Sequence, residues 1–174
     1  MDFMGPLPQS LGNDYLLVII DWLMSQVHLV PTMTWVTTQE VAWLFLKEVV
    51  RLHGAPKSIV SDRNTKFRST FWRELHRLMG TKLLMSTAFY PHMDGATERA
   101  NRSIGQILKM IINDHQKNWA DKCPMVEFAL NSSVSTTTGF APFELNQGYS
   151  DSQNWVNVWC FWTIHWIALN VKHI

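Results

Sequence analysis

The sequence predicts an α/β protein in which helices flank a mixed five-stranded sheet. Residues 15–20 form an unbroken run of β-prone apolar side chains, as expected for a strand that is covered on both faces. Further along the chain, segments with apolar residues at helical spacing alternate with short apolar segments. The resulting order is β-β-β-α-β-α-β-α-α, which gives a mixed sheet with helices on its faces.

Three strands are expected at the start of the chain, at residues 1–4, 15–20 and 27–30. Breaker residues at positions 5–8, two of which are proline, end the first of them. Only a short connection joins the second and third strands, so we expect these two to pair antiparallel. His28 lies inside the third strand and is expected to be a packed side chain.

A capping box marks the beginning of the first helix. Thr37 is the predicted N-cap and Glu40 follows three residues later, the spacing at which each side chain binds the backbone N–H of the other residue. Apolar residues then recur at helical spacing as far as Leu52, before Gly54 and Pro56 end the helix. We expect this helix to pack on the core.

The second half of the predicted fold continues the alternation. A strand at residues 57–62 ends in a carboxylate, and a polar loop follows at residues 63–66. The bases of this loop could contact phosphate, and an ordinary exposed loop explains them equally well. The remaining expected elements are a helix at residues 71–78, a strand at 83–85, helices at 96–111 and 121–130, and a helical turn at 140–145.

Composition places the chain among globular proteins. Of its 174 residues, 47% are hydrophobic and 17% are charged, which excludes a disordered protein and suits one domain. The net charge of +1 is unevenly spread, since residues 47–117 carry thirteen Lys and Arg but only six Asp and Glu. A basic region of this kind suits a phosphodiester substrate, and a solvated surface is the alternative.

The number of cysteines and the N-terminal residues indicate the cellular compartment in which the protein is expected. Cys123 and Cys160 are the only cysteines, so the sequence predicts neither a zinc motif nor a disulfide framework, and a reducing intracellular compartment is expected. The residues after Met1 show no signal-peptide pattern. The apolar stretch near the C-terminus is too short and interrupted for a membrane span, so no membrane partner is expected.

Glu98 is the first candidate for chemistry. It lies in the first turns of the helix expected from Ala96, about 120° around from the apolar stripe of that helix. The preceding loop is interrupted by Pro91 and Gly95. A single Glu here is also explained by the positive end of the helix dipole, or by a pair with Arg102 at i+4.

Two further carboxylates strengthen the functional interpretation. Asp62 closes the predicted strand at residues 57–62, and Asp2 opens the chain. With Glu98 they make three carboxylates on separate elements. Such a set can converge to hold two divalent metal ions, which prefer hard oxygen ligands.

The motifs around these carboxylates resemble a known family, the integrase catalytic core of gypsy-type LTR retrotransposons, in the retroviral integrase superfamily. Three segments carry the resemblance: HGAPKSIVSDR at residues 53–63, STAFYPHMDGATERANR at 86–102 and STTTGFAPFEL at 135–145. The resemblance covers residues 1–149, an expected core-like domain whose first strand is truncated at its N-terminal side. Residues 150–174 form an apolar tail that is not similar to the family.

The resemblance implies a ribonuclease H-like fold and a metal-dependent polynucleotidyl transferase that processes DNA 3′ ends and then transfers the strands into target DNA. It implies two Mg²⁺ (or Mn²⁺) ions, with Asp2, Asp62 and Glu98 as the catalytic and metal-binding triad. A simple hydrolytic nuclease on the same fold is a further possibility, because water can replace the attacking 3′-hydroxyl. The implied location is the nucleus or the cytoplasm.

The resemblance also implies DNA partners, both element ends and target DNA, and assembly as a homo-oligomer, with no small-molecule substrate. By matching position, the implied DNA-binding residues are Tyr90, His92, Asp94, Asn101 and Arg102. Alternative roles are open for three of them: Tyr90 could pack in the loop, Asp94 could cap the helix, and Arg102 could pair with Glu98.

Two features depart from the family pattern. Asp2 lies almost at the chain end, so its strand is expected to fray, and the Met1 ammonium is expected to weaken cation binding nearby. The tail at residues 150–174 is interpreted as sequence read past a break in an old reading frame, rather than a docking or interfacial segment. The alternative function is therefore a truncated or domesticated retrotransposon remnant, weak or inert in catalysis, that binds nucleic acid or dimerises.

Overall fold

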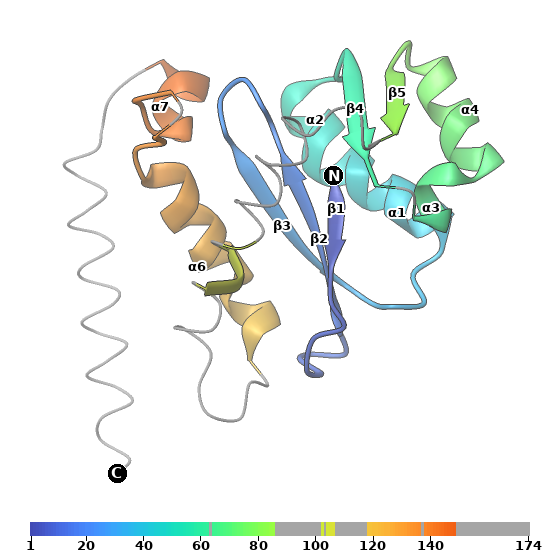
Figure 1. Cartoon of the computed structure of the whole chain (residues 1–174), viewed down its shortest axis with the longest axis horizontal. Helices are drawn as coiled ribbons and strands as arrows, with labels where there is room; N and C mark the ends of the chain where they lie inside the picture. Colours follow the sequence, from blue (N-terminus) through green and yellow to red (C-terminus); the bar gives the residue numbers. More distant parts are fainter. Residues whose placement is uncertain (63, 86–101, 103, 107–117, 137, 149–174) are drawn as a thin grey trace. The chain divides into compact units, whose positions relative to one another are not determined.

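The structure is a computed structural model of the whole chain. It describes residues 1–62, 64–85, 102, 104–106, 118–136 and 138–148 (Figure 1). The chain divides into two compact units, one formed by residues 1–20 and 27–127 and the other by residues 21–26 and 128–174. The predicted tail at residues 150–174 lies outside the described residues.

The first three strands of the first unit form an antiparallel sheet. They are β1 (Asp2–Met4), β2 (Tyr15–Ile20) and β3 (Val27–Thr32), in the order β1-β2-β3 (Figure 1). The predicted antiparallel pairing of the second and third strands is confirmed. Residues 16–18 at the centre of β2 are all buried, although their side chains alternate between the two faces of the sheet. This strand is therefore covered on both faces, as the unbroken apolar run predicts.

The other two strands of this unit pair in parallel. They are β4 (Ser58–Ser61) and β5 (Lys82–Met85), and α3 (Thr65–Arg68) and α4 (Thr70–Leu78) make the crossover that a parallel pair requires. The five described strands therefore lie in a three-stranded and a two-stranded sheet. The α/β class is confirmed, whereas the predicted single five-stranded sheet is not.

The helix expected after Thr37 is present but not uniform. It consists of α1 (Thr38–Phe45), a π-helical turn (Leu46–Val50) and α2 (Arg51–His53). Gly54 then ends it, with a positive φ of 80° that favours glycine. The sequence thus predicted the two ends of this segment correctly but not the wider turn in its middle.

The predicted capping box begins α1. The backbone N–H of Glu40 donates to Thr37 Oγ1 at 3.3 Å, and the backbone N–H of Thr37 donates to Glu40 Oε2 at 2.7 Å. Replacing Thr37 with alanine removes the acceptor for the first of these bonds. We expect Thr37→Ala to lower the free energy of unfolding by about 1 kcal/mol in urea denaturation, and Thr38→Ala, at the neighbouring position, to cost clearly less. Equal losses in the two variants would contradict this role.

One hydrophobic core holds the first unit together. It takes residues from both sheets and from α1, α3 and α4, namely Leu17, Ile19, Val30, Val36, Val41, Ala42, Phe45, Ile59, Phe67 and Trp72. The Phe45 and Trp72 rings meet edge to face with centroids 5.7 Å apart, an arrangement that favours aromatic pairs. The two sheets therefore belong to one packed body although they are separate ladders.

The later part of the chain contributes α6 (Trp119–Ser132) and α7 (Pro142–Gln147), where helical structure was predicted. The start of α6 belongs to the first unit, in which Trp119 Nε1 donates to the Pro8 carbonyl at 2.6 Å. Within the second unit, the Phe128 and Phe143 rings lie 5.8 Å apart. In the described ranges, no helix combines the length and the apolar character needed to cross a membrane.

Candidate active site

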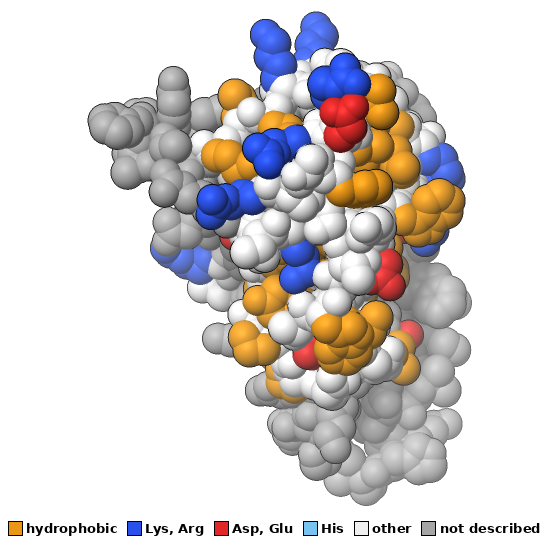
Figure 2. Space-filling view, turned by 90° about the vertical axis from the view of Figure 1, so that its right-hand side faces the viewer, with side chains coloured by type: hydrophobic (Ala, Val, Ile, Leu, Met, Phe, Trp, Pro, Cys, Tyr) orange, Lys and Arg blue, Asp and Glu red, His pale blue; other side chains and the backbone are white. Residues whose placement is uncertain are grey.

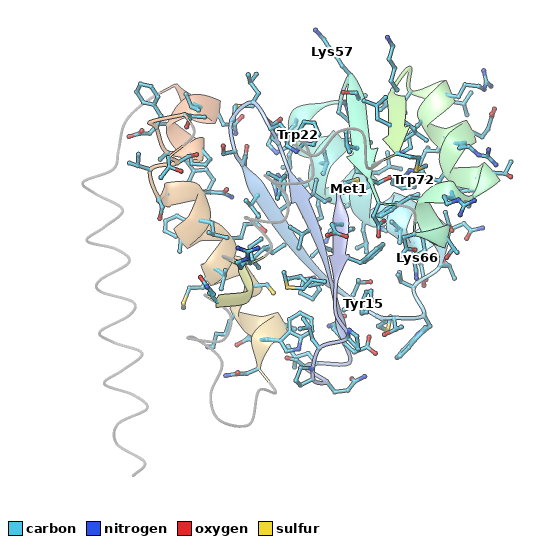
Figure 3. All side chains as sticks on the ribbon, in the orientation of Figure 1. Met1, Tyr15, Trp22, Lys57, Lys66 and Trp72 are labelled. Atoms are coloured by element: carbon cyan, nitrogen blue, oxygen red, sulfur yellow. The ribbon has the colours of Figure 1, made fainter. Side chains whose placement is uncertain are left out.

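The start of β1 and the end of β4 bring two of the predicted catalytic carboxylates together. Asp2 is the first residue of β1, and Asp62 directly follows β4. The Met1 backbone nitrogen donates to the Val60 carbonyl at 2.7 Å, so the beginning of β1 lies beside β4 (Figure 3). Asp2 and Asp62, which lie one and two residues from the two ends of this hydrogen bond, are therefore in the same region of the fold although they are far apart in the sequence.

The environment of Asp62 raises the pKa of its carboxyl group. Burial of the carboxyl raises its pKa above the ordinary value, and repulsion from the Asp2 carboxylate raises it further. The Asn64 N–H, which donates to Asp62 Oδ1 at 3.1 Å, and the Met1 ammonium both act in the opposite direction. A half-buried carboxyl that a second carboxylate repels is a place where a divalent cation would relieve the excess negative charge.

The first strand is anchored, contrary to the expectation that it frays. β1 pairs with β2 over its whole length, and the Met1 nitrogen is bound to Val60. Burial lowers the pKa of the Met1 ammonium to about 6, although Asp2 and Asp62 favour its charged form. The amine therefore lies within the electrostatic reach of both carboxylates.

Phe3 sets the direction of Asp2. The Phe3 ring stacks on Phe67, with centroids 5.2 Å apart and an interplanar angle of 17°, and packs against the core. Successive side chains of a strand point to opposite faces, so the packing of Phe3 turns Asp2 away from that aromatic contact. The carboxylate is thus presented by a strand whose other face is held in the core.

Asn64 and Lys66, in the predicted polar loop after β4, make defined contacts. Asn64 holds Asp62 through its backbone N–H, while its side chain caps α3 by accepting from the Lys66 N–H at 3.1 Å. Lys66 Nζ donates to the Thr34 carbonyl at 3.1 Å and lies 5.5 Å from the centroid of the Phe3 ring. Sequence reasoning missed the role of Asn64, although Asp-x-Asn is a turn-forming pattern that could have indicated it.

The structure places only part of the predicted site. Glu98, the third carboxylate, lies outside the described residues, as do Tyr90, His92, Asp94 and Asn101. Arg102 lies in a helical turn and is exposed. Among the residues that are described, no three His, Cys, Asp or Glu side chains are grouped so that they could hold a metal ion. Asp2 and Asp62 nevertheless supply the hard oxygen donors that Mg²⁺ prefers.

Known proteins are similar to this chain in sequence and in fold. The Transposon Tf2-3 and Tf2-4 polyproteins of Schizosaccharomyces pombe are each 30% identical to it over 150 residues, which is 86% of this chain. The chain spans only 11% of the length of these polyproteins. No family model matches the chain.

Two solved structures share the fold. A chain in the simian T-cell lymphotropic virus intasome, solved in complex with PP2A regulatory subunit B56 gamma, has a TM-score of 0.66 at 17% identity, over 83% of this chain and 53% of that one. The HTLV-2 integrase catalytic core domain, in complex with magnesium in a trimeric form, has a TM-score of 0.62 at 20% identity, over 82% of this chain and 93% of that domain. The resemblance is thereby confirmed: this chain is homologous to part of a retrotransposon polyprotein and has the fold of a retroviral integrase catalytic core.

Proposed function

We propose that the chain is the catalytic core of an integrase that processes DNA 3′ ends and transfers them into target DNA. The observation that carries this proposal is the convergence of Asp2 and Asp62 at the junction of β1 and β4, in a chain with the integrase core fold. Glu98 completes the proposed triad. Its place in the sequence, at the predicted start of a helix after a Pro- and Gly-containing loop, supports this assignment.

The same junction supports a single five-stranded ribonuclease H-like sheet. In this proposal β1 is the parallel neighbour of β4, so that the strand order becomes β3-β2-β1-β4-β5. The hydrogen bond from the Met1 nitrogen to Val60 is the first contact of such a pairing. The shared hydrophobic core also favours it, since Leu17 of one sheet and Ile59 of the other pack in the same cluster.

The roles of the residues follow from their chemistry. Asp2, Asp62 and Glu98 would hold two Mg²⁺ or Mn²⁺ ions, which, when bound, activate the attacking oxygen and stabilise the leaving oxygen of an in-line displacement at phosphorus. Asp62 is oriented by the Asn64 N–H, and Asp2 by the pairing of β1 with β2. The attacking group is water or a DNA 3′-hydroxyl, so the chain needs no covalent nucleophile of its own.

Exposed bases support DNA as the partner. Arg68, Arg73 and Arg77 are exposed on α3 and α4, and Lys57 and Lys82 are exposed near the paired ends of β4 and β5. Figure 2 shows the face that carries α4, on which Lys and Arg are more prominent than acidic side chains. Such a face would bind phosphates without reading sequence.

The remaining assignments rest on the resemblance. Tyr90, His92, Asp94, Asn101 and Arg102 are the proposed contacts to the DNA of the element ends. We further propose a homo-oligomer on DNA and a nuclear or cytoplasmic location. The intasome and the trimeric core with similar folds support assembly of this kind.

A branched oligonucleotide that already has the joined geometry would test the proposal. The purified chain with Mg²⁺ or Mn²⁺ is expected to resolve the branch, and Glu98→Gln is expected to abolish the reaction while circular dichroism shows an unchanged fold. Resolution by both proteins would remove Glu98 from the site. Failure of a folded wild-type chain would instead favour the remnant that binds nucleic acid or dimerises, which DNA-binding and sedimentation measurements would then examine.

A further inference from the structure

Two histidines from distant parts of the first unit meet at their ring nitrogens. His28 lies in β3 and His53 is the last residue of α2, and their Nε2 atoms are 3.0 Å apart. The ring centroids are 5.2 Å apart, so the rings approach each other through these nitrogens rather than by stacking. His28 is therefore more than the packed side chain that the sequence predicts.

Glu127 of α6 orients one of the two rings. Its Oε1 lies 3.1 Å from His28 Nδ1, and its Oε2 accepts from the Leu29 backbone N–H at 2.8 Å. A carboxylate accepts hydrogen bonds, so His28 Nδ1 carries the proton and, in the neutral ring, Nε2 of His28 carries a lone pair. In this structure that lone pair accepts the hydrogen bond that His53 Nε2 donates at 3.0 Å.

This arrangement has the form of a histidine prepared to bind a metal ion. Histidines that ligate metals commonly donate their other ring N–H to a carboxylate, which fixes the tautomer and makes the ligating nitrogen more basic. Two imidazole nitrogens on one tetrahedral zinc ion, each about 2.0–2.1 Å from the metal, lie about 3.3 Å apart. The observed separation of 3.0 Å is close to this value, so a small rotation of the exposed His53 ring, in the tautomer protonated at Nδ1, would replace the hydrogen bond by two metal–nitrogen bonds.

We propose that His28 and His53 form a binding site for a first-row transition metal such as Zn²⁺, with Glu127 as the carboxylate that orients His28. Imidazole suits Zn²⁺, whereas Mg²⁺ prefers oxygen ligands, so this site is chemically distinct from the carboxylate pair at Asp2 and Asp62. His53 is exposed, which gives the ion access from solvent and leaves room for water as the remaining ligands. The ion would fasten α2 to β3.

Zinc alone is the probe. Titration calorimetry of the full chain with ZnCl₂, in a buffer with millimolar Mg²⁺ to occupy the carboxylates, is expected to show one saturable Zn²⁺ site. Because Zn²⁺ binds the folded chain, the midpoint of thermal unfolding should also rise with zinc concentration. His53→Gln is expected to abolish both effects, and Glu127→Gln is expected to weaken binding by about 10–100-fold.

Two controls separate this site from other ligands in the chain. His173→Gln tests unspecific binding by another of the seven histidines, and Asp2→Asn with Asp62→Asn tests binding at the carboxylate pair. Both controls are expected to keep the wild-type affinity for Zn²⁺. The proposal would be overturned if His53→Gln is folded by circular dichroism and still binds Zn²⁺ as the wild type does. It would also be overturned if the wild-type chain binds no Zn²⁺. Neither readout depends on catalytic activity.

Discussion

Asp62→Asn is expected to lower metal-dependent resolution of a branched DNA by about 10³-fold. In the proposed site Asp62 is a ligand that carries negative charge, and asparagine keeps its shape but not that charge. Loss of a metal ligand removes several kcal/mol of stabilisation of the transition state, and about 4 kcal/mol corresponds to a factor of about 10³ in rate. Single-turnover rates with Mg²⁺ or Mn²⁺ would measure the effect.

Asp121→Asn is the matched control for this experiment. Asp121 lies in the first turn of α6 and its side chain is largely exposed, so the same chemical change there should leave the rate unaltered. The folded fraction of both variants should equal that of the wild type, because Asn64 can still donate its backbone N–H to the oxygen of Asn at position 62. A rate for Asp62→Asn close to that of the wild type would remove Asp62 from the chemistry.

The free energy of unfolding is expected to fall by about 3 kcal/mol between pH 6.5 and pH 4 because of His76 alone. Burial lowers the pKa of His76 from 6.5 to about 4. The side chain is fully buried between Phe45 and Trp72, with ring centroids 5.2 and 4.3 Å away, and neither ring nitrogen has a hydrogen-bond partner among the described residues. Among the described residues, the charged form therefore gains no hydrogen bond that would offset the cost of its burial.

The direction follows from proton binding. Between pH 6.5 and pH 4 the unfolded chain binds a proton at His76 and the folded chain does not, so acidification favours unfolding. Well above pH 6.5 the contribution of neutral His76 to the free energy of unfolding is fully present, and well below about pH 4 this contribution is lost completely.

A second variant separates His76 from the carboxyl groups that titrate in the same range. His76→Leu has no proton to bind, so the difference in unfolding free energy between this variant and the wild type should grow as the pH falls. Guanidinium or urea denaturation at several pH values would measure it. A difference that does not change with pH would show that His76 does not titrate as its burial indicates.

Local sequence patterns predicted the elements well because short-range geometry decides them. The capping box of Thr37 and Glu40 needs only four consecutive residues, and the strand at Tyr15–Ile20 needs only its apolar run. The π-helical turn at Leu46–Val50 was missed, because the spacing of the apolar residues there suits an ordinary helix. The motifs around Asp62 likewise predicted the resemblance that the fold confirms.

Within the described residues, the sequence by itself thus determined the order of strands and helices, the boundaries that caps and glycine mark, and the resemblance to integrase cores; most of the helix predicted at residues 96–111 lies outside those residues. The tertiary structure decided which side chains meet. Asp2 and Asp62 converge because β1 begins beside β4, and His28 of β3 contacts His53 of α2 and Glu127 of α6 although the three are far apart in the sequence. Helical and strand periods repeat within a few residues and set which face a side chain occupies. The meeting of groups far apart in the chain depends instead on burial of one shared core, which no local period specifies.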